Sequence, residues 1–237
     1  MQRQTISTIL RNASVFDIKN WREVSLSNQS SNQNLPDSES VRRLFEMIKL
    51  QKIGDYLLVG GIAMLNYIEG RNTEDIDLVF DEGQISRVDG LEVISKDQDF
   101  CRAQFENIQI DLLLTNNKVF KYVLKHCSSR TSYADATDIA IASPMGLIIL
   151  KLYALPSLYR QGQFDRATLY ESDITQLLRK YPVTITEVLK PLKPPVLLGS
   201  DLEEVKNIFL DIQSRINKER DRFSKFQYSL LRNQGVQ

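Results

Sequence analysis

The sequence contains little cysteine and histidine, and this scarcity excludes several kinds of active site. Its 237 residues include two cysteines, Cys101 and Cys127, and one histidine, His126. Two cysteines do not make a disulfide framework, and no spaced group of cysteines and histidines predicts a zinc site. A hydrolase with a serine, histidine and aspartate triad would have to use His126, and nothing around this residue indicates one.

Net charge and long apolar runs are also missing. The 30 lysines and arginines balance the 30 aspartates and glutamates. A net charge of zero gives no general attraction to nucleic acid, so only a local basic patch could bind it. No apolar run is long enough to cross a membrane and no signal peptide is evident, so we expect a protein of the reducing cytoplasm. A chain of this length and ordinary composition fits one large domain, or one domain with a small addition.

Residues 56–80 have the pattern of a strand, a tight turn, a helix and a second strand, with the sequence YLLVGGIAMLNYIEGRNTEDIDLVF. The apolar run Tyr56–Val59 predicts a short strand that ends at Gly60 and Gly61. Two glycines allow a sharp turn and leave no side chain between the backbone and a ligand. The mostly apolar run 62–68 then predicts a helix. The glycine turn is therefore a place where a ligand could approach the backbone closely.

Two aspartates in the second strand are the first candidate metal ligands. Residues 74–80 alternate acidic and aliphatic side chains before they become apolar, which favours a strand. Alternate residues of a strand point to the same face, so we expect Asp75 and Asp77 to project together. Their mutual repulsion requires compensation, and Mg²⁺ provides it because this ion binds a few carboxylates together with phosphate oxygens and water. The alternative is a strand end with two solvated acids.

A third aspartate, Asp111, lies in the run 107–114, where it is the only charge among residues that favour strands. A lone charge in such a run is costly unless it is paired or bound to a metal ion. By itself Asp111 could be an acid on an edge strand that faces solvent. Together with Asp75 and Asp77, it predicts a cradle for two metal ions.

These features together resemble the nucleotidyltransferase superfamily with the DNA polymerase β-like fold. The resemblance covers about residues 40–180. It is carried by the Gly-Gly turn, the short helix, Arg71-Asn72-Thr73, Asp75-Ile76-Asp77 and the later strand with Asp111. Among members of the superfamily, the pattern is nearest to the abortive-infection toxin and related stand-alone bacterial enzymes. The resemblance implies an α/β (α+β) fold, in which helices flank a mixed sheet, followed by a C-terminal helical extension.

The same resemblance implies a reaction. A nucleoside monophosphate would pass from an NTP, such as ATP, to an acceptor hydroxyl, with release of pyrophosphate. Asp75 and Asp77 would hold two Mg²⁺ ions, or Mn²⁺ in their place. Asp111 would hold the second ion and help to activate the acceptor hydroxyl. The two ions would clamp the attacking and leaving oxygens in line.

The residues predicted to bind the nucleotide come from both halves of the chain. Gly60 and Gly61 would let backbone amides meet the triphosphate, and Arg71 would neutralise phosphate charge. Lys151 is the only charge in the apolar run 145–155, which predicts a buried helix. The resemblance implies that this lysine contacts phosphate. The alternative is a lysine whose stem is buried and whose ammonium reaches the surface.

Asp173 is a further candidate, at the edge of the apolar stripe of a helix predicted over residues 165–181. It is either a solvated acid or a residue that binds nucleotide. Related enzymes often carry a Lys-Asp pair and then a second aspartate ahead of an Ile-x-x-Leu-Leu pattern. Residues 173–178 match the second part, whereas Leu169 and Tyr170 stand where the Lys-Asp pair would be. This departure weakens the transfer of substrate chemistry from those enzymes.

Three regions follow from these patterns: an N-terminal segment and linker over 1–36, a nucleotidyltransferase core over 37–142 and a C-terminal helical region over 143–237. Within the helical region, Pro156 is expected to kink or end the helix that begins at Ser143. The remaining predicted elements are helices at 39–51, 119–126 and 202–231, strands at 90–95, 101–105 and 137–142, and a polar loop at 128–135.

The acceptor is not determined by these patterns: a tRNA end, a protein hydroxyl and a small molecule such as an aminoglycoside are all open. A CCA-adding enzyme is disfavoured, because those enzymes carry an Arg-Asp pair where Ile62-Ala63-Met64 stands. A different class is also open, namely a non-catalytic nucleotide-binding or antitoxin-like partner protein. A cognate toxin or antitoxin, or a role in phage defence, fits either class. The basic residues of the C-terminal helix are a solvated face or a surface for RNA or protein.

Overall fold

A computed structural model of the chain describes most residues from Ser38 onward. The described ranges are 38–51, 53–68, 75–106, 108–133 and 137–234. The predicted N-terminal segment 1–36 and the candidate residue Arg71 lie outside them. The described residues fall into two compact units that divide between Leu150 and Lys151. Among them, no helix has the length and apolar character needed to cross a membrane.

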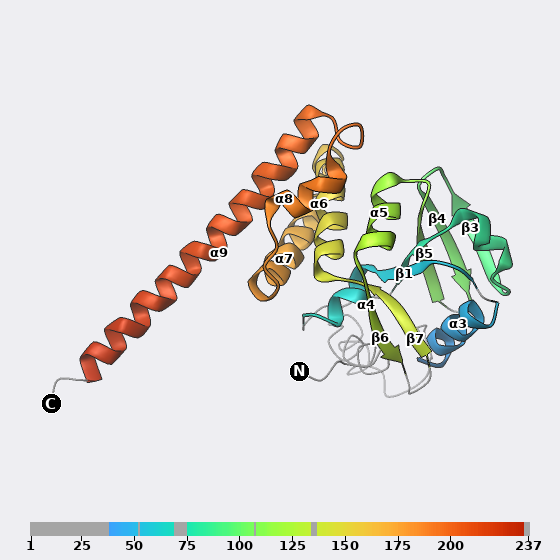
Figure 1. Ribbon diagram of the computed structural model, residues 1–237, viewed down its shortest axis with the longest axis horizontal. Helices are drawn as coiled ribbons and strands as arrows, with labels where there is room; N and C mark the ends of the chain where they lie inside the picture. Colours follow the sequence, from blue (N-terminus) through green and yellow to red (C-terminus); the bar gives the residue numbers. More distant parts are fainter. Residues whose placement is uncertain (1–37, 52, 69–74, 107, 134–136, 235–237) are drawn as a thin grey trace, which may run out of the picture. The chain divides into compact units, whose positions relative to one another are not determined.

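The described strands of the first unit form a seven-stranded mixed sheet in the order β3-β4-β5-β2-β1-β7-β6 (Figure 1). Strand β2 is parallel to β5, β1 is parallel to β7, and the other neighbours are antiparallel. The sheet and its flanking helices confirm the predicted α/β fold class, in which helices flank a mixed sheet. The strands are β1 (Tyr56–Val59), β2 (Ile76–Phe80), β3 (Leu91–Lys96), β4 (Phe100–Phe105), β5 (Ile108–Leu114), β6 (Ser128–Tyr133) and β7 (Thr137–Ala142).

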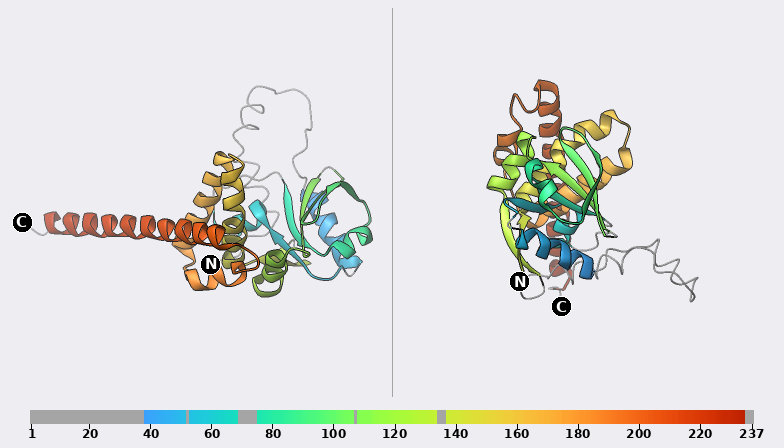
Figure 2. Two further views of the ribbon diagram at one scale, coloured as in Figure 1. Left: turned by 90° about the horizontal axis from the view of Figure 1, so that it is seen from above. Right: turned by 90° about the vertical axis from the view of Figure 1, so that its right-hand side faces the viewer.

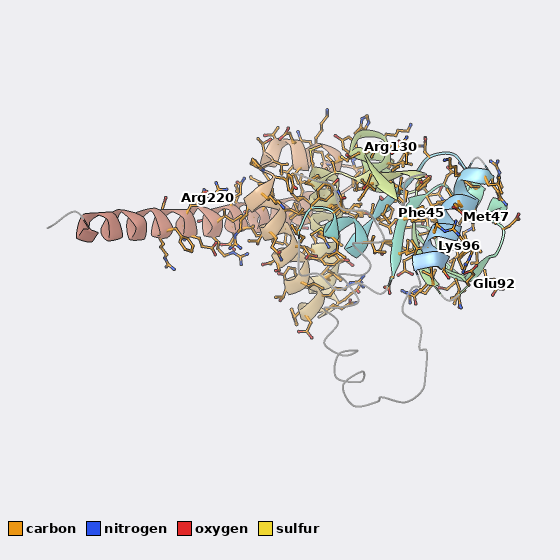
Figure 3. The ribbon with its side chains drawn as sticks, turned by 90° about the horizontal axis from the view of Figure 1, so that it is seen from below. Phe45, Met47, Glu92, Lys96, Arg130 and Arg220 are labelled. Carbon is orange, nitrogen blue, oxygen red and sulfur yellow. The ribbon has the colours of Figure 1, made fainter. Side chains whose placement is uncertain are left out.

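One face of the sheet carries the apolar core of this unit. Helix α3 (Ser38–Leu50) covers this face, because the ring centroid of its Phe45 lies 6.0 Å from that of Tyr56 on β1 (Figure 3). Tyr56 pairs with Phe80 on β2, so both side chains point to the same face. The other buried apolar residues of α3 are Val41, Leu44 and Ile48, and those of β4 and β5 on this face are Cys101, Ala103, Phe105, Ile108, Ile110, Leu112 and Leu114.

The opposite face is covered in part by helix α5 (Lys118–His126). The side chain of Asn117 caps this helix by accepting hydrogen bonds from the backbone N–H groups of its first residues. The ring centroids of Phe120 on α5 and Phe100 on β4 lie 5.4 Å apart. Phe100 pairs with Leu113 near the end of β5, so α5 covers the region where β5 ends. The part of this face near the start of β2 is where the candidate acids lie.

One prediction about local structure is wrong, and one is narrowed. Residues 128–135 were expected to form a polar loop, but β6 occupies Ser128–Tyr133 and pairs antiparallel with β7. An antiparallel edge strand needs only one buried face, and the other face can be polar. In β6, the side chain of Thr131 is buried. Pro156 was expected to kink or end its helix, and it does not end there, because α6 (Pro144–Arg160) continues beyond it. Proline removes one backbone hydrogen bond, and its neighbours Leu155 and Leu158 are buried.

The second unit consists of helices, as predicted for the C-terminal extension. It contains the end of α6, then α7 (Phe164–Lys180), α8 (Ile185–Leu189), the short 3-10 helix η2 (Lys190–Leu192) and α9 (Gly199–Gln234). Helix α9 is one long continuous helix (Figure 2). Its apolar stripe contacts α7 and α8. The buried residues of that stripe are Val205, Phe209, Ile212 and Ile216.

Candidate active site

Two of the three candidate acids lie next to each other in the sheet. Strands β2 and β5 are parallel neighbours, and their register pairs Asp77 with Asp111. Residues paired across neighbouring strands point to the same face, which for these two is the face opposite α3. Both aspartates are half-buried. The structure therefore places two carboxylates side by side at a partly open position of the sheet.

The third acid, Asp75, enters the site differently from the prediction. It was expected to alternate with Asp77 within a strand, but β2 begins at Ile76 and Asp75 lies in a bend before it. Asp75 still acts on the site, because its charge is among those that raise the pKa of Arg102. Residues 69–74, which include Arg71, are not among those described.

Gly60 lies directly against Asp77. The register pairs Val59 with Asp77, so the turn that follows β1 begins beside this carboxylate. The φ angle of Gly60 is 63°, in the left-handed region that favours glycine. A Cβ atom at Gly60 would lie 1.7 Å from Oδ2 and 2.3 Å from Cγ of Asp77, so no other residue fits. Both glycines belong to helix α4 (Gly60–Leu65), which begins two residues before the predicted start at Ile62.

Gly60→Ala is expected to destabilise the first unit and to displace Asp77. The left-handed conformation alone costs alanine about 1–2 kcal/mol, and the new methyl group would also overlap the carboxylate. Gly90→Ala is the matched control, because Gly90 has a φ of 79° in the same unit and its Cβ would meet only the edge of the Phe105 ring at 3.3 Å. Urea unfolding should show the larger loss for Gly60→Ala. Equal losses, together with an unchanged affinity for Mn²⁺, would contradict the prediction.

Asp111 makes a bidentate ion pair with Arg102, which the sequence analysis did not identify. Strands β4 and β5 pair these residues directly. Nε of Arg102 donates to Oδ1 of Asp111 at 2.8 Å, and Nη2 donates to Oδ2 at 2.9 Å. The pKa of Arg102 is raised, first by its hydrogen bond to Asp111, then by the charge of Asp111 and, more weakly, by those of Asp75 and Asp77. The guanidinium therefore remains charged and faces both oxygens of Asp111.

A signal for this pair does exist in the sequence. A two-residue turn after residue 105 would place residue 105 opposite 108, as the structure has it. Counting outward along both strands then places 102 opposite 111. The predicted start of the second strand at residue 107 leaves one residue for the turn, and it would place 102 opposite 110 rather than 111.

The donor set fits a hard divalent cation in its chemistry, because carboxylate oxygens are the ligands that Mg²⁺ and Mn²⁺ accept. Its present arrangement is not that of a metal site. Among the described residues, no group of three or more histidine, cysteine, aspartate or glutamate side chains is placed to hold a metal ion. Both oxygens of Asp111 face Arg102 instead. Arg102 thus already contacts both oxygens that Asp111 could offer to a metal ion.

The two cysteines are not candidates for nucleophilic catalysis. Cys101 and Cys127 are both buried and form no disulfide. Burial raises the pKa of the Cys127 thiol to about 11 and also raises that of Cys101. Both thiols are therefore protonated near neutral pH, and a protonated thiol is a poor nucleophile.

Lys151 and Asp173 form a buried ion pair within the second unit. Lys151 on α6 places Nζ 2.8 Å from Oδ2 of Asp173 on α7, and the two side chains are 7% and 1% exposed. The same Nζ lies 4.1 Å from the centre of the Tyr170 ring, which is a cation–π contact. The ammonium of Lys151 is thus not at the surface, and Asp173 is not a solvated acid. Tyr170 occupies one of the positions where related enzymes carry the Lys-Asp pair.

Comparisons with known proteins gave matches among solved structures. No protein-family model matches the sequence, and no curated protein resembles it closely enough to count as a match. An antigenic nucleotidyltransferase-like protein from Paracoccidioides brasiliensis has a TM-score of 0.44 and 17% identity, covering 71% of this chain and 90% of that one. The crystal structure of ANT(2")-Ia in complex with adenylyl-2"-tobramycin has a TM-score of 0.46 and 13% identity, covering 75% of this chain and 97% of that one. The solution structure of the antibiotic-resistance factor ANT(2'')-Ia has a TM-score of 0.45 and 12% identity, covering 79% of this chain and 97% of that one.

Proposed function

We propose that the protein is a metal-dependent nucleotidyltransferase, which moves a nucleoside monophosphate from an NTP to an acceptor hydroxyl. The observation that carries the proposal is the register of Asp77 and Asp111 on parallel neighbouring strands, with Gly60 packed against Asp77. Two carboxylates held side by side repel each other, and a divalent cation would relieve that repulsion. Glycine lets the backbone of this turn pack directly against Asp77, so phosphate oxygens held at that carboxylate by a metal ion would be close to the turn.

In this proposal the residues have distinct roles. Asp75 and Asp77 would hold Mg²⁺ or Mn²⁺, and a bound ion would neutralise charge on the triphosphate and on the leaving pyrophosphate. Asp111 would share that site and accept the proton of the acceptor hydroxyl at its carboxylate. Gly60 and Gly61 would present backbone N–H groups to the phosphates.

Lys151 is proposed to bind phosphate, together with Arg71. The buried contact between Lys151 and Asp173 supports a positioning role for Asp173 rather than a direct one. Its carboxylate holds the ammonium in one place, and the ring of Tyr170 contacts the same ammonium from another direction. The nucleotide would then meet a lysine whose direction is already determined.

The acceptor could be a tRNA end, a protein hydroxyl or a small molecule such as an aminoglycoside. A toxin–antitoxin or phage-defence role in the cytoplasm, with a cognate partner protein, belongs to the same proposal. One observation favours a second candidate, a non-catalytic nucleotide-binding or antitoxin-like protein. Arg102 neutralises Asp111 through both of its oxygens, and a protein that never activates a hydroxyl could retain such a pair.

A labelling experiment tests the proposal. The protein is incubated with Mg²⁺, cell extract and each NTP labelled on the α-phosphate, because transfer of a nucleoside monophosphate retains that phosphate and discards the other two. Wild type is expected to label an acceptor, whereas Asp111→Asn should bind NTP and label none. NTP labelled on the γ-phosphate should label nothing, and excess chelator should stop the reaction.

Glu106→Gln is the matched control for Asp111→Asn. Glu106 also accepts two hydrogen bonds from one arginine, Arg43, so its replacement likewise removes a carboxylate from a bidentate ion pair. This control should retain wild-type labelling. If wild type labels no acceptor and Asp111→Asn is identical to it in NTP binding, the second candidate should replace the first. Turnover in excess chelator would instead exclude the metal mechanism.

A further inference from the structure

Three charged residues form one row across adjacent strands of the sheet. The order of the strands is β4, β5, β2, and the register pairs Arg102 with Asp111 and Asp111 with Asp77. Asp111 is thus between a guanidinium on one side and a second carboxylate on the other. The side chain of Arg102 is 51% exposed and that of Asp111 is 25% exposed. The arginine can therefore turn away into solvent, whereas Asp111 is held more closely by the sheet.

The guanidinium and a metal ion would need the same atoms. Arg102 uses both oxygens of Asp111 in a geometry that matches the planar fork of arginine. A divalent cation at Asp77 and Asp111 needs lone pairs of the same carboxylate, and it would repel the positive charge of Arg102. Simultaneous binding of the Arg102 guanidinium and a divalent cation to Asp111 is therefore unfavourable.

We propose that Arg102 competes with the divalent cation for Asp111, so that metal binding to the acids requires Arg102 to release this carboxylate. The inference rests on the proposed function in one respect, namely that the acids hold a metal ion. Without metal, Arg102 compensates the charge of the acids and holds Asp111 in one orientation. It is a positioning residue, because it acts on the site through Asp111.

A purely structural role for the pair predicts something else. An exposed cross-strand ion pair contributes little to stability, and its arginine would then affect metal affinity only through its charge, which Arg102→Lys retains. The affinity for metal therefore distinguishes the two roles, and it can be measured without any turnover.

The test measures Mn²⁺ binding to the full chain without nucleotide. Binding is monitored through the loss of the electron paramagnetic resonance signal of free Mn²⁺. Arg102→Gln is expected to bind Mn²⁺ about tenfold more tightly than wild type, because a charge-assisted hydrogen-bond pair no longer has to be broken. Arg102→Lys should fall between the two, since lysine offers a point charge without the bidentate fork. It also serves as the second variant if glutamine disturbs β4.

The matched control is Arg43→Gln, which breaks another bidentate arginine–carboxylate pair, that with Glu106. This pair includes none of the three acids, so Mn²⁺ affinity should remain at the wild-type value. Asp77→Asn measures how much Mn²⁺ binds to the protein outside this site.

The outcomes separate the inference from the proposed function. If wild type binds Mn²⁺ above the Asp77→Asn background and Arg102→Gln leaves that affinity unchanged or weaker, the competition is disproved and the metal site remains. If no variant binds above the background, the acids hold no metal ion, and both the inference and the metal-dependent function are overturned. A tenfold increase in Mn²⁺ affinity for Arg102→Gln, without an increase for Arg43→Gln, supports both the competition and the metal site.

Discussion

Asp77→Asn is expected to lower the rate of nucleotidyl transfer by about a thousandfold while the fold remains intact. A metal ion contributes several kcal/mol of charge stabilisation in the transition state, and each 1.4 kcal/mol changes the rate about tenfold. Asparagine has nearly the shape of aspartate, so the contact with Gly60 is retained and only a charged ligand is lost. The measurement is the initial rate with α-labelled NTP at saturating Mg²⁺, together with the free energy of unfolding.

Asp138→Asn is the matched control for this variant. Asp138 is an exposed acid on β7 of the same sheet, and it is not one of the candidate ligands. Its replacement should leave both the rate and the stability close to wild type. A rate for Asp77→Asn within tenfold of wild type would show that this carboxylate does not hold a metal ion that the reaction needs.

Lys151→Met is expected to lower the free energy of unfolding by about 3–5 kcal/mol, because it leaves the carboxylate of Asp173 buried without its counter-charge. Methionine approximates the length of the lysine stem, so the packing of α6 changes little. Had the ammonium been at the surface, the same substitution would have been neutral or stabilising. The structure predicts destabilisation instead, because both side chains are almost fully buried.

A second substitution identifies the cause of the loss. Lys151→Met combined with Asp173→Leu should recover most of the stability, since replacing a whole buried ion pair by apolar residues is often neutral. Lys206→Met is the control, because Lys206 pairs with Glu203 on the exposed side of α9 and should cost less than about 1 kcal/mol. If Lys151→Met costs no more than this control, the buried pair does not contribute as proposed. Calorimetric titration with NTP then shows whether Lys151 also binds phosphate.

Much of the sheet could be predicted from local patterns. Strand β7 has the predicted bounds, and β3, β4 and α5 begin within one residue of their predicted starts. These segments have clear alternation or helical spacing of apolar residues, and the apolar core of the sheet follows from it. Strand β6 could not be found in this way, because its polar sequence becomes a strand only through pairing with β7.

The candidate site was predicted as a set of residues, and the sequence alone could not provide its geometry. Which residues lie opposite each other on β2 and β5 depends on a parallel register between strands that are distant in the chain. The contact of Gly60 with Asp77 depends on the same assembly. The pairing of Lys151 with Asp173 depends on how two helices pack, and the spacing within either helix does not contain that information.

The row of Arg102, Asp111 and Asp77 has a consequence for how this site can adjust. Neighbouring strands lie about 4.8 Å apart and are rotated by roughly 20–25° relative to each other, so the backbone determines the spacing of these side chains and the angle between them. Sliding one strand by a residue would turn each of its side chains to the opposite face, which excludes small shifts along the strands. Adjustment to a bound ligand would therefore depend on side-chain rotation at Arg102, Asp111 and Asp77 and on the bend at Asp75. The backbone hydrogen bonds of the sheet therefore keep the spacing of the three residues fixed. The side chains of one arginine and two aspartates could then change partners without a change in the fold.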